Sequence, residues 1–360
     1  SKVDMTINDS SAAGLNLNLS GALDNSKLIL GSGGSTLNMD TAKNGSLITL
    51  GGGTVSLTAN SLGAASGARV TINSNTAAAS STLANTFTVS NGLTNVDFTG
   101  NDNGNNLLVG GDIVGSKLNL GGGTNSLTGL GGTNAESTGM FKGSTLSGSG
   151  ANTINLGSID GYGVRGPAVN LSGTITNMSV GGTIKNASLV MGAAENNFTA
   201  AGAIGTGTTN NVNMTFGAAD AVGKNNITLL EGMKGSNLSS LGAAGSSHTL
   251  TLGGVMSGKN TINMGEGFSS IAATAATFGA TTADRLSINL LGSGDLDFGA
   301  NKLNNASINL GAGATSFAAT AGMTNTSIKR TAAGTLTLDS GTIDKGTIAL
   351  TDGADTLNIN

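Results

Sequence analysis

Apolar and polar residues alternate along most of the chain, in short runs that end at glycine. In SKLNLGGGTNSLT at 116–128, Leu118 and Leu120 alternate with polar neighbours, three glycines follow, and Leu127 resumes the alternation. A period of two is typical of a strand with one buried face. Glycine adopts positive φ angles and lets another backbone approach closely. Each run therefore predicts a strand that ends at a glycine corner.

The run recurs at a loose interval of about twenty residues. The last apolar residue before the glycine corner is Leu30 and then Leu50, and later Leu290 and then Leu310, each pair 20 residues apart. One coil of this length buries too little apolar surface to offset its lost conformational entropy, so coils must stack and share a core. We predict an all-β fold, a parallel β-solenoid (β-helix or β-roll) of irregular coils with a repeat near 20 residues and about fourteen to eighteen coils.

We expect residues 1–360 to form a single continuous β-solenoid. Both ends of the sequence read as cuts through the repeat, which predicts a fragment or a processed segment. The alternation breaks near 129–151, 161–168 and 232–248. Irregular insertions between coils are expected there.

Composition supports an ordered but unusual protein. The 360 residues include 60 glycines, one proline and no cysteine, and 10% are charged, whereas an ordinary domain has roughly 7% glycine and about 25% charge. Low charge with abundant glycine, serine, threonine and asparagine is also compatible with a disordered, low-complexity chain, but the apolar residues, 38% of the total, fall at strand spacing. The Ala-rich stretches at 269–279 and 318–323 could hold a helical turn, although glycine generally disfavours helices.

Several classes of partner are not expected. The net charge is −4 and no cluster of lysine and arginine occurs, so the electrostatic footprint of a nucleic-acid-binding protein is missing. The sequence contains no run of about 18 apolar residues, so no transmembrane helix is predicted. The lack of cysteine excludes a disulfide scaffold and is compatible with a secreted bacterial protein or with a cysteine-free cytosolic one.

Several phrases resemble the haemolysin-type (RTX) nonapeptide, G-G-x-G-x-D-x-hydrophobic-x. GNDNGNNLLVGGD at 100–112 is the most similar, and Gly121, Gly123 and Leu127 occupy matching places in GGGTNSL. The resemblance implies a parallel β-roll whose aspartates hold calcium between turns. The chelating position nevertheless lacks the acid in four phrases, where it holds Ser35, Val55, Asn125 and Thr315.

Calcium is the one cofactor that the carboxylates suggest. Only Asp355, in GADTL, keeps the acid at the chelating position. Calcium requires several oxygen ligands, usually including carboxylates. The candidate metal ligands are Asp102 with Asp112, and Asp352 with Asp355.

The Thr/Asn/Gly/Ala-rich composition with short Leu-x-Leu strands is similar to that of bacterial surface-layer proteins and large secreted adhesins. This resemblance implies export and an extracellular β-solenoid at the cell surface. The leading hypothesis is a structural subunit of a surface layer, filament or matrix fibre, which self-associates through its coil ends into a polymer or lattice. The alternative is an adhesin or autotransporter stalk that binds host or cell-surface glycans.

An enzyme on a β-helix is the third hypothesis and is not expected. The sole histidine, His248, has no GxSxG serine elbow to act with, so an outward-facing, inert histidine is predicted. Asp295 and Asp297 share one face of a strand, an arrangement that glycosidic chemistry can use, but solvated acids are commoner. GYGVRGPAV at 161–169 is either a contact loop or a simple insertion.

Thr-x-Thr pairs raise the possibility of ice binding. They occur at 86–88, 174–176, 249–251 and 335–337. A flat ladder of threonines would suit an ice lattice, but the pairs do not recur at one fixed place in each coil. We attribute them to the threonine-rich composition.

Overall fold

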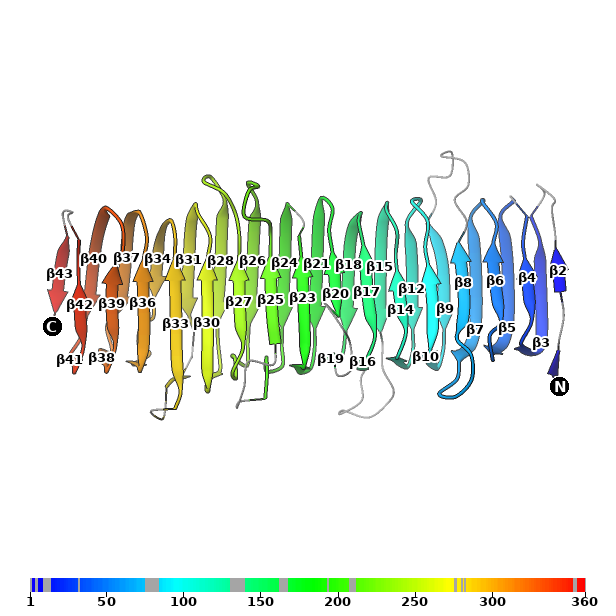
Figure 1. The fold of residues 1–360 in the computed structure, drawn as a ribbon, viewed down its shortest axis with the longest axis horizontal. Helices are drawn as coiled ribbons and strands as arrows, with labels where there is room; N and C mark the ends of the chain where they lie inside the picture. Colours follow the sequence, from blue (N-terminus) through cyan, green and yellow to red (C-terminus); the bar gives the residue numbers. More distant parts are fainter. Residues whose placement is uncertain are drawn as a thin grey trace. The chain divides into compact units, whose positions relative to one another are not determined.

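The computed structural model describes residues 2–3, 6–8, 14–31, 33–74, 84–129, 140–161, 168–192, 194–206, 212–274, 277–279, 281, 283–351 and 355–359. The chain divides into two compact units, Ser1–Met178 and Ser179–Asn360, called unit 1 and unit 2 below. Each is a parallel β-solenoid (Figure 1). The chain has about 15 coils with a spacing of about 21 residues, which confirms the predicted fold. No helix occurs in the described residues, and the described parts of the Ala-rich stretches form strands and turns.

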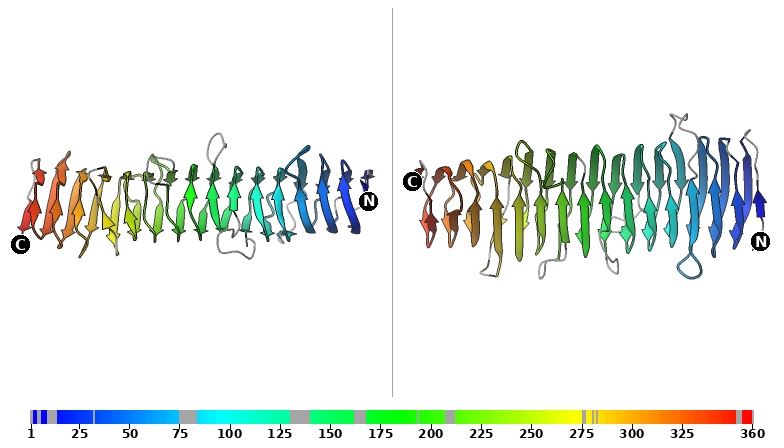
Figure 2. Two further views of the ribbon diagram at one scale, coloured as in Figure 1. Left: turned by 90° about the horizontal axis from the view of Figure 1, so that it is seen from below. Right: turned by 45° about the horizontal axis from the view of Figure 1, so that its top comes forward.

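Each coil contributes to two parallel sheets, called sheet A and sheet B, which form two layers joined by corners (Figure 2). In unit 1, sheet A contains β1 (Lys2–Val3), β3 (Asn16–Asp24), β5 (Ser35–Lys43), β7 (Val55–Gly63), β9 (Asn85–Val89), β10 (Gly92–Thr94), β12 (Asn105–Val109), β13 (Asp112–Val114), β15 (Thr124–Gly129), β16 (Met140–Lys142), β18 (Ala151–Leu156) and β19 (Ser158–Asp160). Sheet B contains β2 (Thr6–Asn8), β4 (Lys27–Ile29), β6 (Leu47–Leu50), β8 (Val70–Ser74), β11 (Val96–Thr99), β14 (Lys117–Asn119), β17 (Thr145–Gly148) and β20 (Val169–Leu171).

Unit 2 repeats this plan, and the boundary between the units falls within β21 (Ile175–Val180). Its sheet A contains β22 (Ile184–Lys185), β24 (Glu195–Ala200), β26 (Lys224–Leu229), β28 (Ser247–Leu252), β31 (Phe268–Ala273), β34 (Ser293–Asp297), β37 (Gly313–Ala319), β40 (Gly334–Ser340) and β43 (Thr356–Ile359). Its sheet B contains β23 (Ala187–Met191), β25 (Val212–Phe216), β27 (Asn237–Ser240), β30 (Lys259–Met264), β33 (Arg285–Leu290), β36 (Ala306–Leu310), β39 (Ser327–Arg330) and β42 (Thr347–Ala349). Short strands at the corners are β29 (Val255–Met256), β32 (Thr277–Phe278), β35 (Leu303–Asn304), β38 (Met323–Thr324) and β41 (Ile343–Asp344).

The core of each unit lies between the two sheets and is built from every second residue of the strands. Leu118 and Leu120 are 2% and 0% exposed, as the alternation predicted. Parallel pairing places like residues above one another, and Ile288 on β33 is level with Ile308 on β36 and Ile328 on β39. Each buried side chain of this kind contributes roughly 1.5–3 kcal/mol. The core is therefore continuous along each unit, and no coil depends on its own contacts alone.

Two kinds of corner join the sheets. At the first, successive glycines stack so closely that a Cβ atom on Gly51 would lie 1.4 Å from the carbonyl oxygen of Gly31, and Gly123 has a φ of +70°. These contacts explain the triple-glycine runs. At the second corner, asparagine adopts the left-handed conformation, which it tolerates better than most residues, with φ near +50° at Asn25, Asn44, Asn95, Asn305 and Asn325. The alternation did not reveal this second corner.

Candidate interaction surfaces and the inner polar column

A column of buried polar side chains runs through unit 1 at the first inward-facing position of the sheet A strands. Asn85, Asn105, Asn125 and Asn152 occupy this inner polar column. The Nδ2 of Asn85 donates to Oδ1 of Asn105 at 3.2 Å, and the Nδ2 of Asn125 donates to Oδ1 of Asn152 at 3.3 Å. The backbone N–H of Asn105 donates to Oδ1 of Asn125 at 3.1 Å. These amides therefore satisfy one another and the backbone across successive coils.

Unit 2 has its own inner polar column, with different residues. The Nδ2 of Asn196 donates to Oδ1 of Asn225 at 2.8 Å, and the Nδ2 of Asn225 lies 3.2 Å from Nδ1 of His248. The Nδ1 of His248 is also 2.9 Å from Oγ of Ser240, and its Nε2 is 3.2 Å from the carbonyl oxygen of Glu266. The histidine thus bonds to three separate segments of unit 2, namely β26, the end of β27 and the corner before β31.

The structure corrects the prediction that His248 faces outward. Its side chain is 1% exposed because it occupies an inward position of β28. The Glu266 carbonyl can only accept, so Nε2 carries the proton and Nδ1 accepts from Asn225 and Ser240. Burial lowers the pKa of His248 from its usual value, and the Glu266 carbonyl opposes this shift. The imidazole is therefore held in its neutral form.

The haemolysin-type chelating position also faces the interior. Ser35, Val55, Asn125 and Thr315 are all buried and lie on the inward side of sheet A. Asn125 belongs to the inner polar column. At Val55 only the backbone takes part, and its N–H donates to Oδ1 of Asn85 at 3.0 Å. The position that resembles a calcium ligand thus serves packing and coil-to-coil hydrogen bonding.

The candidate calcium ligands bind backbone N–H groups of adjacent coils. Oδ1 of Asp102 accepts the backbone N–H of Gly122 at 3.0 Å, and Oδ1 of Asp112 accepts that of Met140 at 2.9 Å. Oδ1 of Asp355 accepts the backbone N–H of Leu336 at 2.6 Å. Asp352 lies outside the described residues. Across the described residues, no group of three or more His, Cys, Asp or Glu side chains is placed to hold a metal ion. Calcium binding stays a prediction.

A buried arginine lies beside Asp355. The Nη2 of Arg330 is 3.8 Å from Oδ1 of Asp355, and its Nη1 donates to the carbonyl oxygen of Gly313 at 3.2 Å. Arg330 takes the inward place that Leu310 holds in the preceding coil. The guanidinium therefore supplies positive charge to this carboxylate.

The outward face of sheet A in unit 1 carries no charge in its two central columns. Thirteen of the fourteen positions are serine, threonine or asparagine, and the exception is Leu108: Asn16, Thr36, Ser56, Thr86, Asn106, Ser126 and Thr153 in one column, and Asn18, Asn38, Thr58, Thr88, Leu108, Thr128 and Asn155 in the other. Among the Thr-x-Thr pairs, Thr86 and Thr88 face outward here, whereas Thr176 is buried. The pairs thus lack one fixed place.

The outward face of sheet B in unit 2 has a similar composition. Its two columns contain Ser188, Asn213, Asn237, Thr261, Ser287, Ser307, Ser327 and Thr347, and Val190, Thr215, Ser239, Asn263, Asn289, Asn309, Lys329 and Ala349. Amides bond along the second column, where Asn309 donates to Asn289 and Asn289 donates to Asn263, both at 2.7 Å.

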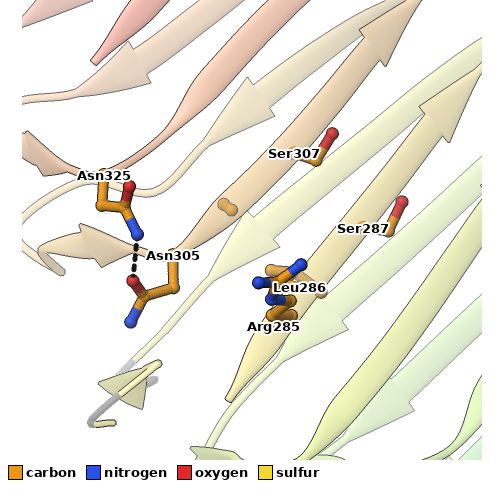
Figure 3. Close-up of a pocket in the computed structure, with 7 residues that line it drawn as sticks. Arg285, Leu286, Ser287, Asn305, Ser307 and Asn325 are labelled. Atoms are coloured by element: carbon orange, nitrogen blue, oxygen red, sulfur yellow. Dashed lines mark hydrogen bonds between the residues drawn. The ribbon is translucent and has the colours of Figure 1, made fainter. Parts of the chain in front are cut away.

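An open hollow of about 570 Å³ lies on this face (Figure 3). Its lining includes Arg285, Ser287, Ser307, Asn305 and Asn325. Asn325 donates to Oδ1 of Asn305 at 2.7 Å. The hollow therefore offers a guanidinium, two hydroxyls and two amides to an incoming polar group.

Asp295 and Asp297 share the outward face of β34, as predicted, and both are exposed. Oδ1 of Asp297 accepts the backbone N–H of Gly299 at 2.8 Å. Within the described part of the chain, neither carboxylate forms an ion pair. The two acids are solvated surface groups in this structure.

The described residues cover the expected insertion at 232–248 in full and the other two in part. In 129–151 they form β16, β17 and the start of β18; in 232–248 they include β27 and the first residues of β28. Residues 130–139 and 162–167 lie outside the described set, and Tyr162, Arg165 and Pro167 are among the latter. No statement about a contact loop at 161–168 follows from the structure.

The fold and these surfaces define a parallel β-solenoid protein. A comparison with known protein families, curated proteins and solved structures found no match. In the described residues, no helix is both long and apolar enough to cross a membrane. Function must therefore be argued from the surfaces of this chain itself.

Proposed function

We propose that this chain is an extracellular structural protein, a β-solenoid subunit that self-associates through its coil ends into a filament, a surface layer or a matrix fibre. Its mechanism is geometric: stacked coils make a stiff body, and a strand edge with an apolar core cross-section binds a further coil. The similarity of its composition to surface-layer proteins motivates the location at a bacterial cell surface.

The observation that carries this proposal is the state of β43. Leu357 and Ile359 are 44% and 54% exposed. In the adjacent strand β40 they are level with Leu338 and Ser340, both buried. The columns of the core therefore continue into β43, whose Leu357 and Ile359 would be buried by any further coil stacked on this strand, including one from a second copy. An exposed strand edge with apolar residues is a template for another strand.

A contact between unlike ends propagates. When β43 of one copy receives the first coil of another, the same contact is available again, so the assembly is an open filament unless rotation closes it into a ring. The added coil would restore the alternation of buried residues that the rest of unit 2 shows. Each buried leucine or isoleucine contributes roughly 1.5–3 kcal/mol.

The test is negative-stain electron microscopy of the purified chain over a series of concentrations, with and without calcium. We expect filaments from the wild type and monomers from Leu357→Lys combined with Ile359→Lys. Leu108→Lys is the matched control, because Leu108 is exposed on the outward face of β12 and away from β43. Dispersed wild-type monomers at the highest concentration would contradict the proposal.

Glycan binding, as in an adhesin stalk, is the second candidate function. The hollow beside Arg285 favours it, because hydroxyl and amide groups there match the hydrogen-bonding groups of a sugar. A glycan array measures this directly. Binding that Ser287→Ala and Ser307→Ala together abolish would support an adhesin, and an array without binding would exclude the glycans displayed.

A further inference from the structure

We propose that unit 2 also binds a second copy of this chain side by side, through the outward face of sheet A in one copy and the outward face of sheet B in the other. The contact deepens the proposed function, which concerns coil ends alone, and it would turn single filaments into bundles or layers. Five charged residues, placed at matching positions along the coils, favour this contact.

The two faces are suited to lie against each other because their side chains are mostly short and uncharged. On sheet A the columns read Asn197, Asn226, Thr249, Ser270, Asp295, Ser316, Thr337 and Thr356, and Thr199, Thr228, Thr251, Ala272, Asp297, Ala318 and Asp339. Most members of both columns of sheet B, given above, are also serine, threonine or asparagine. Regular strands carrying such residues make flat surfaces on which few charges must be desolvated.

From β30 onward the charges have opposite signs on the two faces, and Lys259 on sheet B is level with Arg285; earlier in unit 2, sheet A carries Glu195 and Lys224, which are level with each other. Asp295, Asp297 and Asp339 are exposed on sheet A. Arg285 and Lys329 are exposed on sheet B. None of the five is ion-paired within the described part of the chain. Each is therefore available to a partner.

The opposite charges lie on the same two coils. In sheet B, β33 carries Arg285 and β39 carries Lys329, with β36 between them. In sheet A, β34 carries Asp295 and Asp297 and β40 carries Asp339, with β37 between them. The two basic strands on sheet B are two coil spacings apart, about 10 Å, and so are the two acidic strands on sheet A. Because β34 directly follows β33 and β40 directly follows β39, each acidic strand belongs with a basic strand.

Figure 1 shows these strands in two layers, with β33, β36 and β39 in front of β34, β37 and β40. A second copy placed alongside in the same orientation, without a shift along the stack, therefore brings each acidic coil level with a basic coil. The coil between them presents Ser307 and Asn309 on one face and Ser316 and Ala318 on the other. A shift by one coil would bring Lys259 level with Asp295 and Asp297 but leave Asp339 against neutral residues, so the unshifted register matches more charges.

The hollow provides a binding site for the contact between Arg285 and the acids of β34 in the second copy. Arg285 lies at its wall beside Ser287 and Ser307 (Figure 3). A carboxylate entering from a neighbouring copy meets a guanidinium and two hydroxyl donors, a combination that favours an anion over a neutral group. Asp295 and Asp297 are level with Arg285 in the proposed register.

Exposed ion pairs are individually weak and are screened by salt. The contact is therefore expected at low ionic strength and should weaken as the Debye length falls from about 10 Å at 0.1 M salt to about 3 Å at 1 M. Its specificity comes from the shared spacing of the charges, because the unshifted register matches opposite charges on two coils and a shift by one coil matches them on one.

The test uses charge reversal on each face of the full chain. One variant carries Asp295→Lys, Asp297→Lys and Asp339→Lys, a second carries Arg285→Asp and Lys329→Asp, and a third carries all five changes. Sedimentation velocity at low salt measures association, electron microscopy measures filament width separately from length, and circular dichroism checks that each variant keeps its strands. Asp344→Lys is the control, because Asp344 is an exposed acid on β41, outside both faces.

The expected result is loss of lateral association in the first two variants, its recovery in the third, and wild-type behaviour in the control. Lateral association that survives either reversal, or that does not return in the third variant, would overturn the inference, as would a wild type that never associates laterally. The two proposals remain separable. Filaments of single width from all variants would leave the end contact standing, whereas lateral pairs without filaments would count against the end contact alone.

Discussion

Units 1 and 2 use the same buried position in different ways. In unit 1 the inner polar column consists of Asn85, Asn105, Asn125 and Asn152, whose amides bond to one another and to the backbone. In unit 2 the column passes from Asn225 to His248. Both arrangements satisfy buried polar groups, but only the second contains a side chain that can take up a proton near neutral pH.

The difference shows which bonds a polar side chain makes at this position and what the position leaves open. Val55 shows that the position can be apolar, but where it holds asparagine or histidine the side chain bonds to the backbone groups of the corner. Asn105 donates to the carbonyls of Asn101 and Leu120 at 2.9 and 2.7 Å, and His248 bonds to the carbonyl of Glu266. The choice between amide and imidazole leaves the geometry intact and decides whether the core responds to pH.

The largest effect is expected from breaking the column in unit 1. Asn105→Ala removes two donors to carbonyl oxygens and the acceptor of the Asn85 amide. Buried groups that lose a partner cost roughly 1–3 kcal/mol each, so the free energy of unfolding should fall by about 3 kcal/mol after partial relaxation. Urea denaturation followed by circular dichroism measures it.

The matched control for this change is Asn106→Ala. Asn106 is the next residue on β12, but it is exposed on the outward face, and exposed substitutions usually change stability by less than about 0.5 kcal/mol. Equal losses from the two variants would show that the inner position has no special role.

The next effect concerns pH and is confined to unit 2. Burial lowers the pKa of His248 in the folded chain below its value in the unfolded chain, so the unfolded chain binds the proton first. The contribution of neutral His248 is therefore complete above about pH 6.5 and is lost as the pH falls below that value. We expect the urea midpoint to decrease between pH 7.5 and pH 5, where carboxylates with ordinary pKa values near 4 titrate little.

His248→Asn converts this part of unit 2 to the amide arrangement of unit 1. The variant should lose the decrease in midpoint between pH 7.5 and pH 5, at a cost of about 1 kcal/mol at pH 8, where the wild type is intact. An unchanged pH dependence in the variant would assign it to other groups. A wild-type midpoint that does not move over this range would contradict the proposed burial effect.

Much of the fold could be predicted from the sequence because it depends on local patterns that every coil repeats. The alternation at Leu118 and Leu120 sets which face is buried, and the glycine runs mark corners where a Cβ atom cannot fit, as at Gly51. The division into two units and the asparagine corner did not follow from it. Asn44 and Asn95 resemble any polar loop residue until the positive φ is known.

The candidate sites were harder to predict because the inward or outward position of a polar residue depends on register. His248 was expected outside, since an isolated histidine is usually solvated, but it lies two residues before Leu250 and shares its face. A spacing of two residues from a buried leucine was the available signal that His248 faces inward. The same spacing places Asn105 before Leu107 and Asn125 before Leu127. The charge match between the faces of unit 2 could not be seen, because it requires knowing which strands adjoin.

The smallest effect is expected from replacing the serine that bonds to the inner polar column, one in each unit. Ser240, at the end of β27, bonds to Nδ1 of His248, and Ser74, at the end of β8, accepts from Nδ2 of Asn85 at 3.1 Å. Ser240→Ala and Ser74→Ala should each reduce the free energy of unfolding at pH 8 by about 1 kcal/mol, because one buried hydrogen bond is lost. Only Ser240→Ala should also alter the pH dependence.

The reason is that the Ser240 hydroxyl donates to Nδ1 and so stabilises the neutral imidazole. Its removal raises the pKa of His248 towards the unfolded value, and the loss of stability between pH 7.5 and pH 5 becomes shallower. NMR titration of the sole histidine reports this pKa directly. If the pKa of His248 in Ser240→Ala equals that of the wild type, the hydroxyl does not select the tautomer, and the two units differ in composition but not in the way their serines act.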